Sequence, residues 1–223
     1  MQGITIAIDG YSATGKSTLA RDLADKLGYV FLDTGSMYRA VTLYLLNNNI
    51  DWTNADALDA ALLKISIAFR RLENGKTITL LNGEDVEDAI RTMRISDKVS
   101  EVAAISAVRK FLVIKQQQIG KEGGIIMDGR DIGTVVFPNA ELKLFVVADF
   151  EVRLKRRLEE IKRSGEEISA EQVAANLRKR DKEETERSDS PLVRANDAIL
   201  FDTSRHTRNS QLEAALEIVG SIL

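Results

Sequence analysis

The stretch Gly10–Thr18, GYSATGKST, constrains the fold of this chain more than any other feature. It follows the apolar run ITIAID and precedes LARDLADKLG, whose apolar residues recur at helical spacing. The pattern is a glycine, four further residues, then glycine, lysine and a hydroxyl residue, and it requires a strand before it and a helix after it. A strand and a helix joined by such a loop begin a βαβ unit, which indicates a parallel sheet.

The backbone of this loop suits a phosphate chain. In the P-loop pattern, the N–H groups of the loop and the N-terminus of the following helix surround phosphate oxygens. We expect Lys16 to reach the β and γ phosphates of a nucleotide and the Ser17 hydroxyl to bind Mg²⁺ directly. An ordinary glycine-rich turn is the alternative. The predicted nucleotide-binding residues are Gly10, Tyr11, Ser12, Ala13, Thr14, Gly15, Lys16, Ser17 and Thr18.

The rest of the chain repeats the alternation of strands and helices, which predicts an α/β fold with a five-stranded parallel sheet flanked by helices. The predicted strands cover 4–9, 29–32, 125–128, 142–147 and 199–202. The predicted helices cover 16–27, 37–47, 96–118, 151–163, 170–186 and 210–223. Residues 64–93 contain two Asn-Gly pairs between alternating runs, which predicts a small antiparallel insertion.

Composition excludes several classes of function. The 31 basic and 34 acidic residues leave a net charge of −3, and aromatic residues make up only 5% of the chain, so we expect no nucleic-acid partner. The absence of cysteine excludes disulfides and thiol catalysis. No signal-peptide pattern and no run of about 18 apolar residues occurs, so we expect a cytoplasmic protein without a membrane partner. No heptad stands out, and we expect a monomer.

The remaining arginines indicate a second, anionic substrate. The segment LDTGSMYRA places Thr34 and Arg39 at the carboxyl edge of the sheet, where ligands of open α/β folds bind. A capped helix with a solvated Arg39 is the alternative. In IIMDGRDIG, Asp128 ends an apolar strand and can hold Mg²⁺ or its waters, while Arg130 would face phosphates. The alternative is a turn in which Arg130 pairs with Asp131.

Two helical segments carry further arginines. Arg153, Arg156 and Arg157 share one helix face and could close as a lid over a transferring phosphoryl group. Salt bridges to Glu159 and Glu160 on a solvated surface are the alternative.

The second of these helical segments is LRKRDKEETERSDSPL, near the C-terminus. Arg180, Glu184 and Arg187 form one stripe along its predicted helix, with a carboxylate between two guanidinium groups. A simple intrahelical ladder of ion pairs explains the stripe equally well.

Together these motifs resemble those of bacterial cytidylate kinases, which belong to the nucleoside monophosphate kinases of the P-loop group. The resemblance runs from the first strand to the last helix, and DGRD followed by GTVVFP is its most discriminating part. It implies a P-loop NTPase fold with its core at 1–33, 94–150 and 169–223. A monophosphate-binding lobe with the insertion would occupy 34–93, and a short helical lid 151–168.

The resemblance also implies an activity, the Mg²⁺-dependent transfer of the ATP γ-phosphoryl group to CMP or dCMP in pyrimidine nucleotide metabolism. The P-loop would hold ATP, and the implied catalytic residues are Lys16, Arg130, Arg153 and Arg157. Arg39 and Arg130 would bind the acceptor phosphate. The implied cytosine and sugar contacts are Thr34, Arg109, Asp131 and Arg187 for the base, and Arg180 and Glu184 for the sugar.

The chain departs from the family pattern in two places. Tyr11 and Ala13 stand where relatives typically have proline and glycine, and Glu184 stands where an aspartate is usual. The longer Glu184 side chain leaves the choice between ribose and deoxyribose open. A kinase for UMP or for an alcohol, with Asp128 or Asp131 as the base, remains an alternative. So does a nucleotide-dependent switch protein, although the chain has no N-K-x-D motif.

Overall fold

The computed structural model describes residues 3–72, 77–165 and 167–222. Two compact units make up the chain. The first combines Met1–Asp33 with Gln116–Leu223, and the second is Thr34–Lys115. The predicted P-loop belongs wholly to the first unit.

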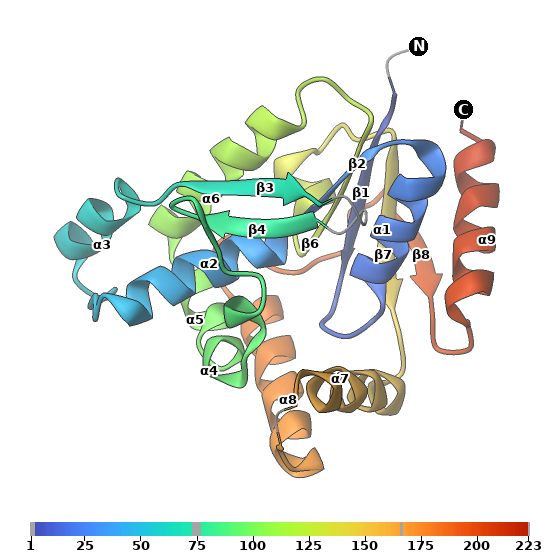
Figure 1. Ribbon diagram of the computed structural model, residues 1–223. Coiled ribbons are helices and arrows are strands. Elements are labelled where there is room, and N and C mark those ends of the chain that lie inside the picture. The colour runs from blue at the N-terminus through green and yellow to red at the C-terminus, as the bar shows by residue number, and fades with distance from the viewer. Residues whose placement is uncertain (1–2, 73–76, 166, 223) are drawn as a thin grey trace. The chain divides into compact units, whose positions relative to one another are not determined.

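A five-stranded sheet forms the centre of the first unit, with the strand order β2-β6-β1-β7-β8 (Figure 1). Every neighbouring pair of strands is parallel. The predicted parallel sheet is therefore confirmed, and no strand end differs from the prediction by more than one residue. The strands are β1 (Thr5–Gly10), β2 (Val30–Asp33), β6 (Ile125–Gly129), β7 (Leu142–Val147) and β8 (Ile199–Asp202).

Helices cover this sheet because its strands are apolar on both faces. Side chains of β1 such as Ile6 and Ile8 pack with Leu19 and Leu23 of the helix that follows the P-loop. Hydroxyl caps mark where the last two long helices begin, at Ser169 and Thr207. The helices of this unit are α1 (Lys16–Leu27), α7 (Phe150–Ser164), α8 (Ala170–Glu186) and α9 (Arg208–Gly220), with a π-helix, η2 (Ile132–Val136).

The carboxyl ends of the central strands meet at one edge of the sheet. In the register, Asp33 of β2 is opposite Asp128 of β6, and Asp9 of β1 is opposite Gly129. Gly10 is opposite Val146 of β7. The P-loop therefore leaves the central strand directly beside the polar residues that end β6, as expected for the ligand-binding edge of an open α/β sheet.

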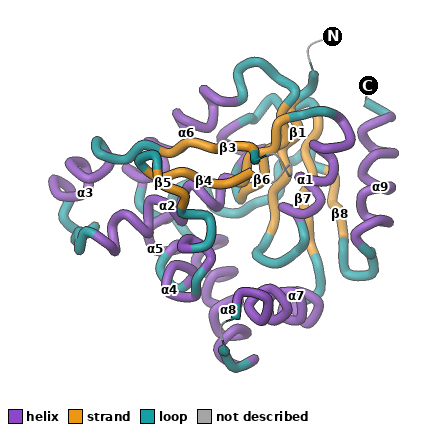
Figure 2. The backbone as a smooth tube through the Cα atoms, viewed as in Figure 1, coloured by secondary structure: helices purple, strands orange, loops and turns teal. Residues whose placement is uncertain are grey.

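The second unit contains a small antiparallel sheet in the order β3-β4-β5, drawn in orange in Figure 2. Its presence confirms the predicted insertion. Asn82 and Gly83 both have positive φ, at 51° and 88°, as a tight hairpin turn between β4 and β5 requires. The other predicted Asn-Gly pair, at 74–75, lies outside the described residues. The strands are β3 (Ile67–Arg71), β4 (Thr77–Leu81) and β5 (Glu84–Asp85).

The helices of the second unit differ from the prediction in three ways. The first begins at Thr34 and not at residue 37, and α3 was not predicted. The expected helix 96–118 is divided into α5 and α6, and α5 packs against α2. No glycine or proline occurs in that range, so the apolar period alone could not locate the breaks. The segments are α2 (Thr34–Asn47), α3 (Ala55–Leu62), η1 (Ala89–Arg91), α4 (Met93–Ser96), α5 (Val99–Ala103) and α6 (Ser106–Ile119), the last of which crosses the unit boundary.

The first glycine of the P-loop lies against the backbone of β7, and this contact yields a prediction. A Cβ atom at Gly10, whose φ is 153°, would lie 2.1 Å from the carbonyl oxygen of Val146. We expect Gly10→Ala to lower the free energy of unfolding by about 3 kcal/mol, because the methyl group overlaps backbone that cannot rotate away.

The matched control is Gly28→Ala. Gly28 also has a positive φ of 70°, but a Cβ atom there meets nothing within 4 Å. The free energy of unfolding of that variant should fall by only about 1 kcal/mol, the cost of placing alanine in a left-handed conformation. Chemical denaturation of both variants measures the difference, and equal losses would contradict the close approach at Gly10.

Candidate active site

The P-loop links the end of β1 to the start of α1 through two left-handed residues. Gly15 has a φ of 88° and directly precedes Lys16, the first residue of α1. Ala13 has a φ of 60°, a conformation that glycine adopts without steric cost. The loop therefore keeps a left-handed residue at Ala13, the position where the family pattern has glycine.

Lys16 is buried and its ammonium group points back into the loop. Its Nζ donates to the carbonyl oxygen of Tyr11 at 3.2 Å, and the Thr14 hydroxyl donates to the same oxygen at 3.0 Å. Burial lowers the pKa of Lys16 to about 8, and the nearby Arg130 guanidinium adds to the shift. A desolvated cation next to a row of loop amides favours binding of an anion.

Ser17 and Asp128 bring two oxygen groups together beside Lys16. The Ser17 hydroxyl donates to Asp128 Oδ2 at 2.5 Å, and Asp128 is only 1% exposed. Burial and the neighbouring Asp33 carboxylate raise the pKa of Asp128 to about 6, against the opposing effects of Lys16 and the Ser17 hydrogen bond. A hydroxyl and a carboxylate suit a hard cation such as Mg²⁺. Among the described residues no cluster of three or more acidic, histidine or cysteine side chains could hold a metal, so such an ion would complete its shell with water and phosphate.

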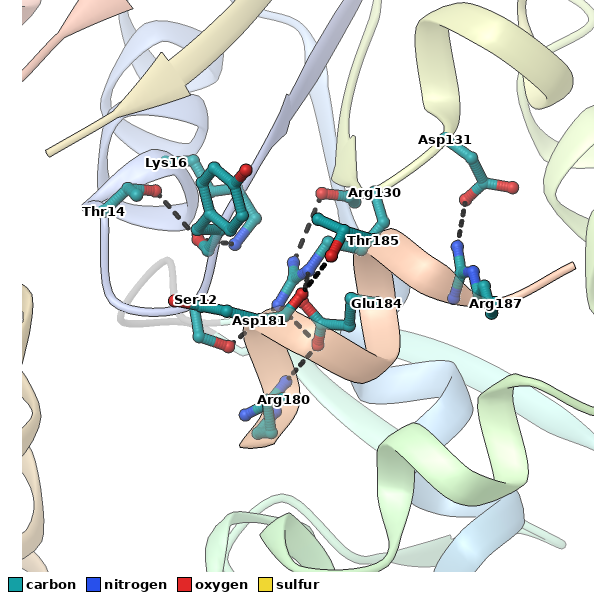
Figure 3. Close-up of polar contacts among 12 residues, drawn as sticks. Ser12, Thr14, Lys16, Arg130, Asp131, Arg180, Asp181, Glu184, Thr185 and Arg187 are labelled. Carbon is teal, nitrogen blue, oxygen red and sulfur yellow. Dashed lines mark hydrogen bonds and ion pairs between the residues drawn. The ribbon is translucent and has the colours of Figure 1, made fainter. Parts of the chain in front are cut away.

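The centre of the site is the carboxylate of Glu184, which is 5% exposed and receives two arginines (Figure 3). Arg130 Nε donates to Glu184 Oε2 at 2.5 Å, and Arg180 Nη2 donates to Glu184 Oε1 at 3.0 Å. Burial alone would raise the pKa of Glu184, but the two guanidinium groups outweigh it and lower the pKa to about 2. The stripe on α8 is therefore more than an intrahelical ladder, because Glu184 also binds an arginine from the end of β6.

Two arginines from different elements contact the same P-loop residue. Arg130 Nη2 donates to the Ser12 hydroxyl at 2.9 Å, and Arg153 Nη1 donates to the Ser12 carbonyl oxygen at 3.3 Å. Arg153 is also held by Asp181 of α8 through two hydrogen bonds, of 2.6 and 3.0 Å. Asp181 and Glu184 lie one helical turn apart on α8, so one helix orients both arginines toward the loop.

The other two arginines of α7 have protein partners as well. Arg156 donates to the carbonyl oxygens of Thr14 and Thr203, at 2.9 Å each. Arg157 forms an ion pair with Glu160 at 2.8 Å. The face that carries Arg153 and Arg156 thus contacts the P-loop. Arg157 makes the ion pair with Glu160 that the alternative predicted, but its side chain is only 14% exposed and does not lie on a solvated surface.

Asp131 and Arg187 face each other at the other side of the site, as Figure 3 shows, with 4.0 Å between Arg187 Nη2 and Asp131 Oδ1. Arg187 also donates through Nε to the Ser190 carbonyl oxygen at 2.8 Å. Since Arg130 pairs with Glu184 and Asp131 faces Arg187, these contacts argue against the alternative of a local Arg130–Asp131 turn.

The remaining predicted residues belong to the second unit. Arg109 is 2% exposed, donates to the Ala103 carbonyl oxygen at 3.0 Å and lies over the ring of Tyr38 at 5.4 Å. Thr34 is buried at the start of α2, and Arg39 is half-buried on the same helix. The structure describes these three residues within their own unit, and their contact with a substrate stays a prediction.

Three residues of the site were missed in the sequence. Asp181 holds Arg153, Thr203 bonds the Thr14 carbonyl oxygen at 2.6 Å, and Asp9 binds the backbone after Asp131. Asp9 and Thr203 both stand at carboxyl ends of predicted strands, which was the available signal. Asp181 has no such signal, because its partner lies 28 residues away.

The buried charge of Glu184 predicts a pH-dependent loss of stability. At pH 7, Glu184→Gln should lower the free energy of unfolding by about 3 kcal/mol, because two buried guanidinium groups lose their carboxylate. The pKa of the folded state, about 2, lies below the ordinary 4.5, so this stabilisation is complete above pH 4.5 and is lost as the pH falls toward 2.

Chemical denaturation of wild type and variant across this pH range measures the effect. Glu186→Gln on the same helix is the control, because the Glu186 side chain is 66% exposed and should change stability by less than about 0.5 kcal/mol. If the difference in the free energy of unfolding between wild type and Glu184→Gln does not shrink at low pH, the stabilisation does not come from the charge of Glu184.

Comparisons with known proteins identify the family of the chain. The model of the family described as cytidylate kinase matches residues 6–221. Cytidylate kinase of Flavobacterium psychrophilum is 50% identical over 226 residues, with all of both chains covered. Cytidylate kinase of Bacteroides thetaiotaomicron is 49% identical over 229 residues, covering 100% of this chain and 99% of that protein.

One solved structure shows the similarity at the level of the fold. An uncharacterized protein from Eubacterium ventriosum superposes with a TM-score of 0.51 at 14% identity, and the match covers 99% of each chain. In the described part of the chain, none of the helices has the length and apolar character needed to cross a membrane. The matches over the full length confirm the resemblance seen in the sequence and the predicted class of enzyme. The chain belongs to the cytidylate kinase family.

Proposed function

We propose that this protein transfers the γ-phosphoryl group of ATP to CMP or dCMP and releases ADP with CDP or dCDP. The observation that carries the proposal is the contact of Arg130 with Ser12, because it joins the P-loop to a cluster of arginines suited to a second phosphate. Membership of the cytidylate kinase family supports the same reaction. A nucleotide-dependent switch would leave this cluster without a purpose.

Catalysis in this proposal is mainly positioning. The phosphate of the acceptor is a nucleophile near neutral pH, so no general base is needed, and the protein has to align it with the γ phosphate and stabilise the developing charge. Lys16 and Arg130 supply that charge from the P-loop and from the end of β6. Arg153 and Arg157 of α7 would complete the set, with Arg153 already oriented by Asp181.

The roles in acceptor recognition follow from the resemblance to cytidylate kinases. Arg130 and Arg39 bind the acceptor phosphate, and Arg180 with Glu184 binds the sugar. The cytosine is recognised by Thr34, Arg109, Asp131 and Arg187. The pairing of Asp131 with Arg187 supports this assignment, since a carboxylate and a guanidinium group together offer both an acceptor and donors to a base. We further propose that the protein acts in the cytoplasm as a monomer.

Mg²⁺ would be held by Ser17 directly and by Asp128, directly or through its waters. When bound, the ion neutralises charge on the phosphates of ATP. The hydrogen bond between Ser17 and Asp128 supports this placement, because it brings both oxygen groups to the end of the phosphate loop.

The test of the function is ADP release with ATP and Mg²⁺ and a panel of CMP, dCMP, UMP, AMP, GMP and no acceptor. We expect turnover that depends on CMP or dCMP, and the ratio of the two reports the effect of Glu184 on sugar preference. Turnover with UMP alone would assign another acceptor. Hydrolysis that needs no acceptor would favour the switch or ATPase alternative.

Lys16 provides the sharpest test of the P-loop. Lys16→Ala should reduce kcat by about a thousandfold, because the charge that stabilises the transferring group is lost from a desolvated site. Lys26→Ala is the control, since Lys26 is an exposed lysine in the last turn of the same helix. Steady-state kinetics and circular dichroism measure activity and folding, and near-normal activity of folded Lys16→Ala would refute the assignment.

The proposed metal site predicts a change in the Mg²⁺ requirement. Asp128→Asn keeps the shape of the side chain but removes its charge, so the Mg²⁺ concentration for half-maximal activity should rise at least about tenfold. Asp25→Asn, on the exposed side of α1, should leave that concentration unchanged. A titration of activity with MgCl₂ at saturating ATP measures both, and an unchanged requirement in Asp128→Asn would exclude Asp128 from the site.

A further inference from the structure

Asp9 is a buried carboxylate that none of the roles above uses. It is 5% exposed and is the residue of β1 just before Gly10, the first residue of the P-loop. Both of its oxygens accept from backbone N–H groups, Oδ1 from Ile132 and Oδ2 from Gly133, each at 2.8 Å. These two amides open the π-helix η2, so the Asp9 side chain caps that helix from a distant part of the sequence.

The same residue holds the other end of this segment through its backbone. In the parallel register, Asp9 is opposite Gly129, the last residue of β6. The chain between Gly129 and Ile132 consists only of Arg130 and Asp131. These two residues therefore project from a short connection whose ends are both fixed to Asp9, one by strand pairing and one by the carboxylate.

The carboxylate is closely surrounded. A Cβ atom at Gly133 would lie 3.1 Å from Cδ of Lys143 and 3.4 Å from Asp9 Oδ2, so the Gly133 backbone, the lysine stem and the carboxylate are packed together. Burial raises the pKa of Asp9 to about 7 against the two amide hydrogen bonds, and Asp131 adds to the rise. The fold thus keeps an acidic group at a place where ionisation is costly, as is common at functional sites.

We propose that Asp9 is a positioning residue for the acceptor nucleotide, which holds Arg130 and Asp131 in register with the P-loop through the backbone amides of Ile132 and Gly133. This inference rests on the proposed function, because it takes Arg130 and Asp131 as the acceptor-binding residues. According to this proposal, Asp9 precedes the loop that binds ATP but selectively affects binding of the acceptor nucleotide.

The first test is Asp9→Asn, which keeps the side-chain shape but offers an acceptor to only one of the two amides. The KM for CMP should rise about tenfold, as expected for loss of one buried hydrogen bond, while the KM for ATP changes less than about twofold. Without nucleotide, amide hydrogen exchange at Ile132 and Gly133 should become faster. A role in stability alone would not separate the two KM values.

The matched control is Glu141→Gln. Glu141 Oε2 accepts the N–H of Thr5 at 2.8 Å, so it makes the same kind of bond at the other end of β1. Neither KM should change in this variant. Equal increases of both KM values in Asp9→Asn, or an unchanged KM for CMP in a folded protein, would overturn the proposal.

Gly133→Ala gives a second route if Asp9→Asn fails to fold. The added methyl group would lie 3.1 Å from Cδ of Lys143 and in contact with Asp9 Oδ2 at 3.4 Å, so it crowds the contact between this amide and the carboxylate while Asp9 remains. It should again raise the KM for CMP more than the KM for ATP. If the wild type does not turn over CMP, the proposed function fails. Hydrogen exchange at the amides of Ile132 and Gly133 then still tests whether Asp9 holds the connection that carries Arg130 and Asp131. Unchanged exchange in Asp9→Asn would overturn this structural part of the proposal.

Discussion

The carboxylate of Glu184 is the group on which the arrangement of this site depends. It lies among three cationic groups, since Arg130 and Arg180 bind it directly and the charge of Lys16 also lowers its pKa. Without a buried negative charge these cations would repel one another in a region of low dielectric constant, where such repulsion is strong. The site can therefore collect positive charge before a phosphate arrives because α8 supplies this carboxylate, with Asp128 and Asp181 as further negative charges near Arg130.

The same helix organises the P-loop from outside. Asp181 orients Arg153, Glu184 orients Arg130, and both arginines meet at Ser12. The P-loop is thus held by one arginine that follows β6 and one from α7, and α8 orients both, although the chain order separates these elements widely. Groups fixed in this way need little reorganisation when charge develops on a bound phosphate, which is the physical basis of electrostatic catalysis.

Predictions from the sequence succeeded where the evidence is local. The P-loop, the five strands and the Asn82–Gly83 turn each depend on residues within a few positions of one another. They failed where tertiary packing overrides local preference, as in the division of 96–118 into α6 and the short helix α5, which packs against α2. The resemblance identified Glu184 as a residue of the site, but not that it joins two arginines from different elements.

By itself, the sequence determined the class of fold, the phosphate loop and the family, because strand and helix periodicity and turn chemistry are properties of neighbouring residues. Only the tertiary structure decided the strand order and the partners of the charged side chains. Arg130 and Glu184 are 54 residues apart, and Asp9 is 123 residues from the amide of Ile132. No local pattern encodes such pairs. They form because folding buries these charged groups away from water, and a buried charge is stable only when another group of the protein pairs with it.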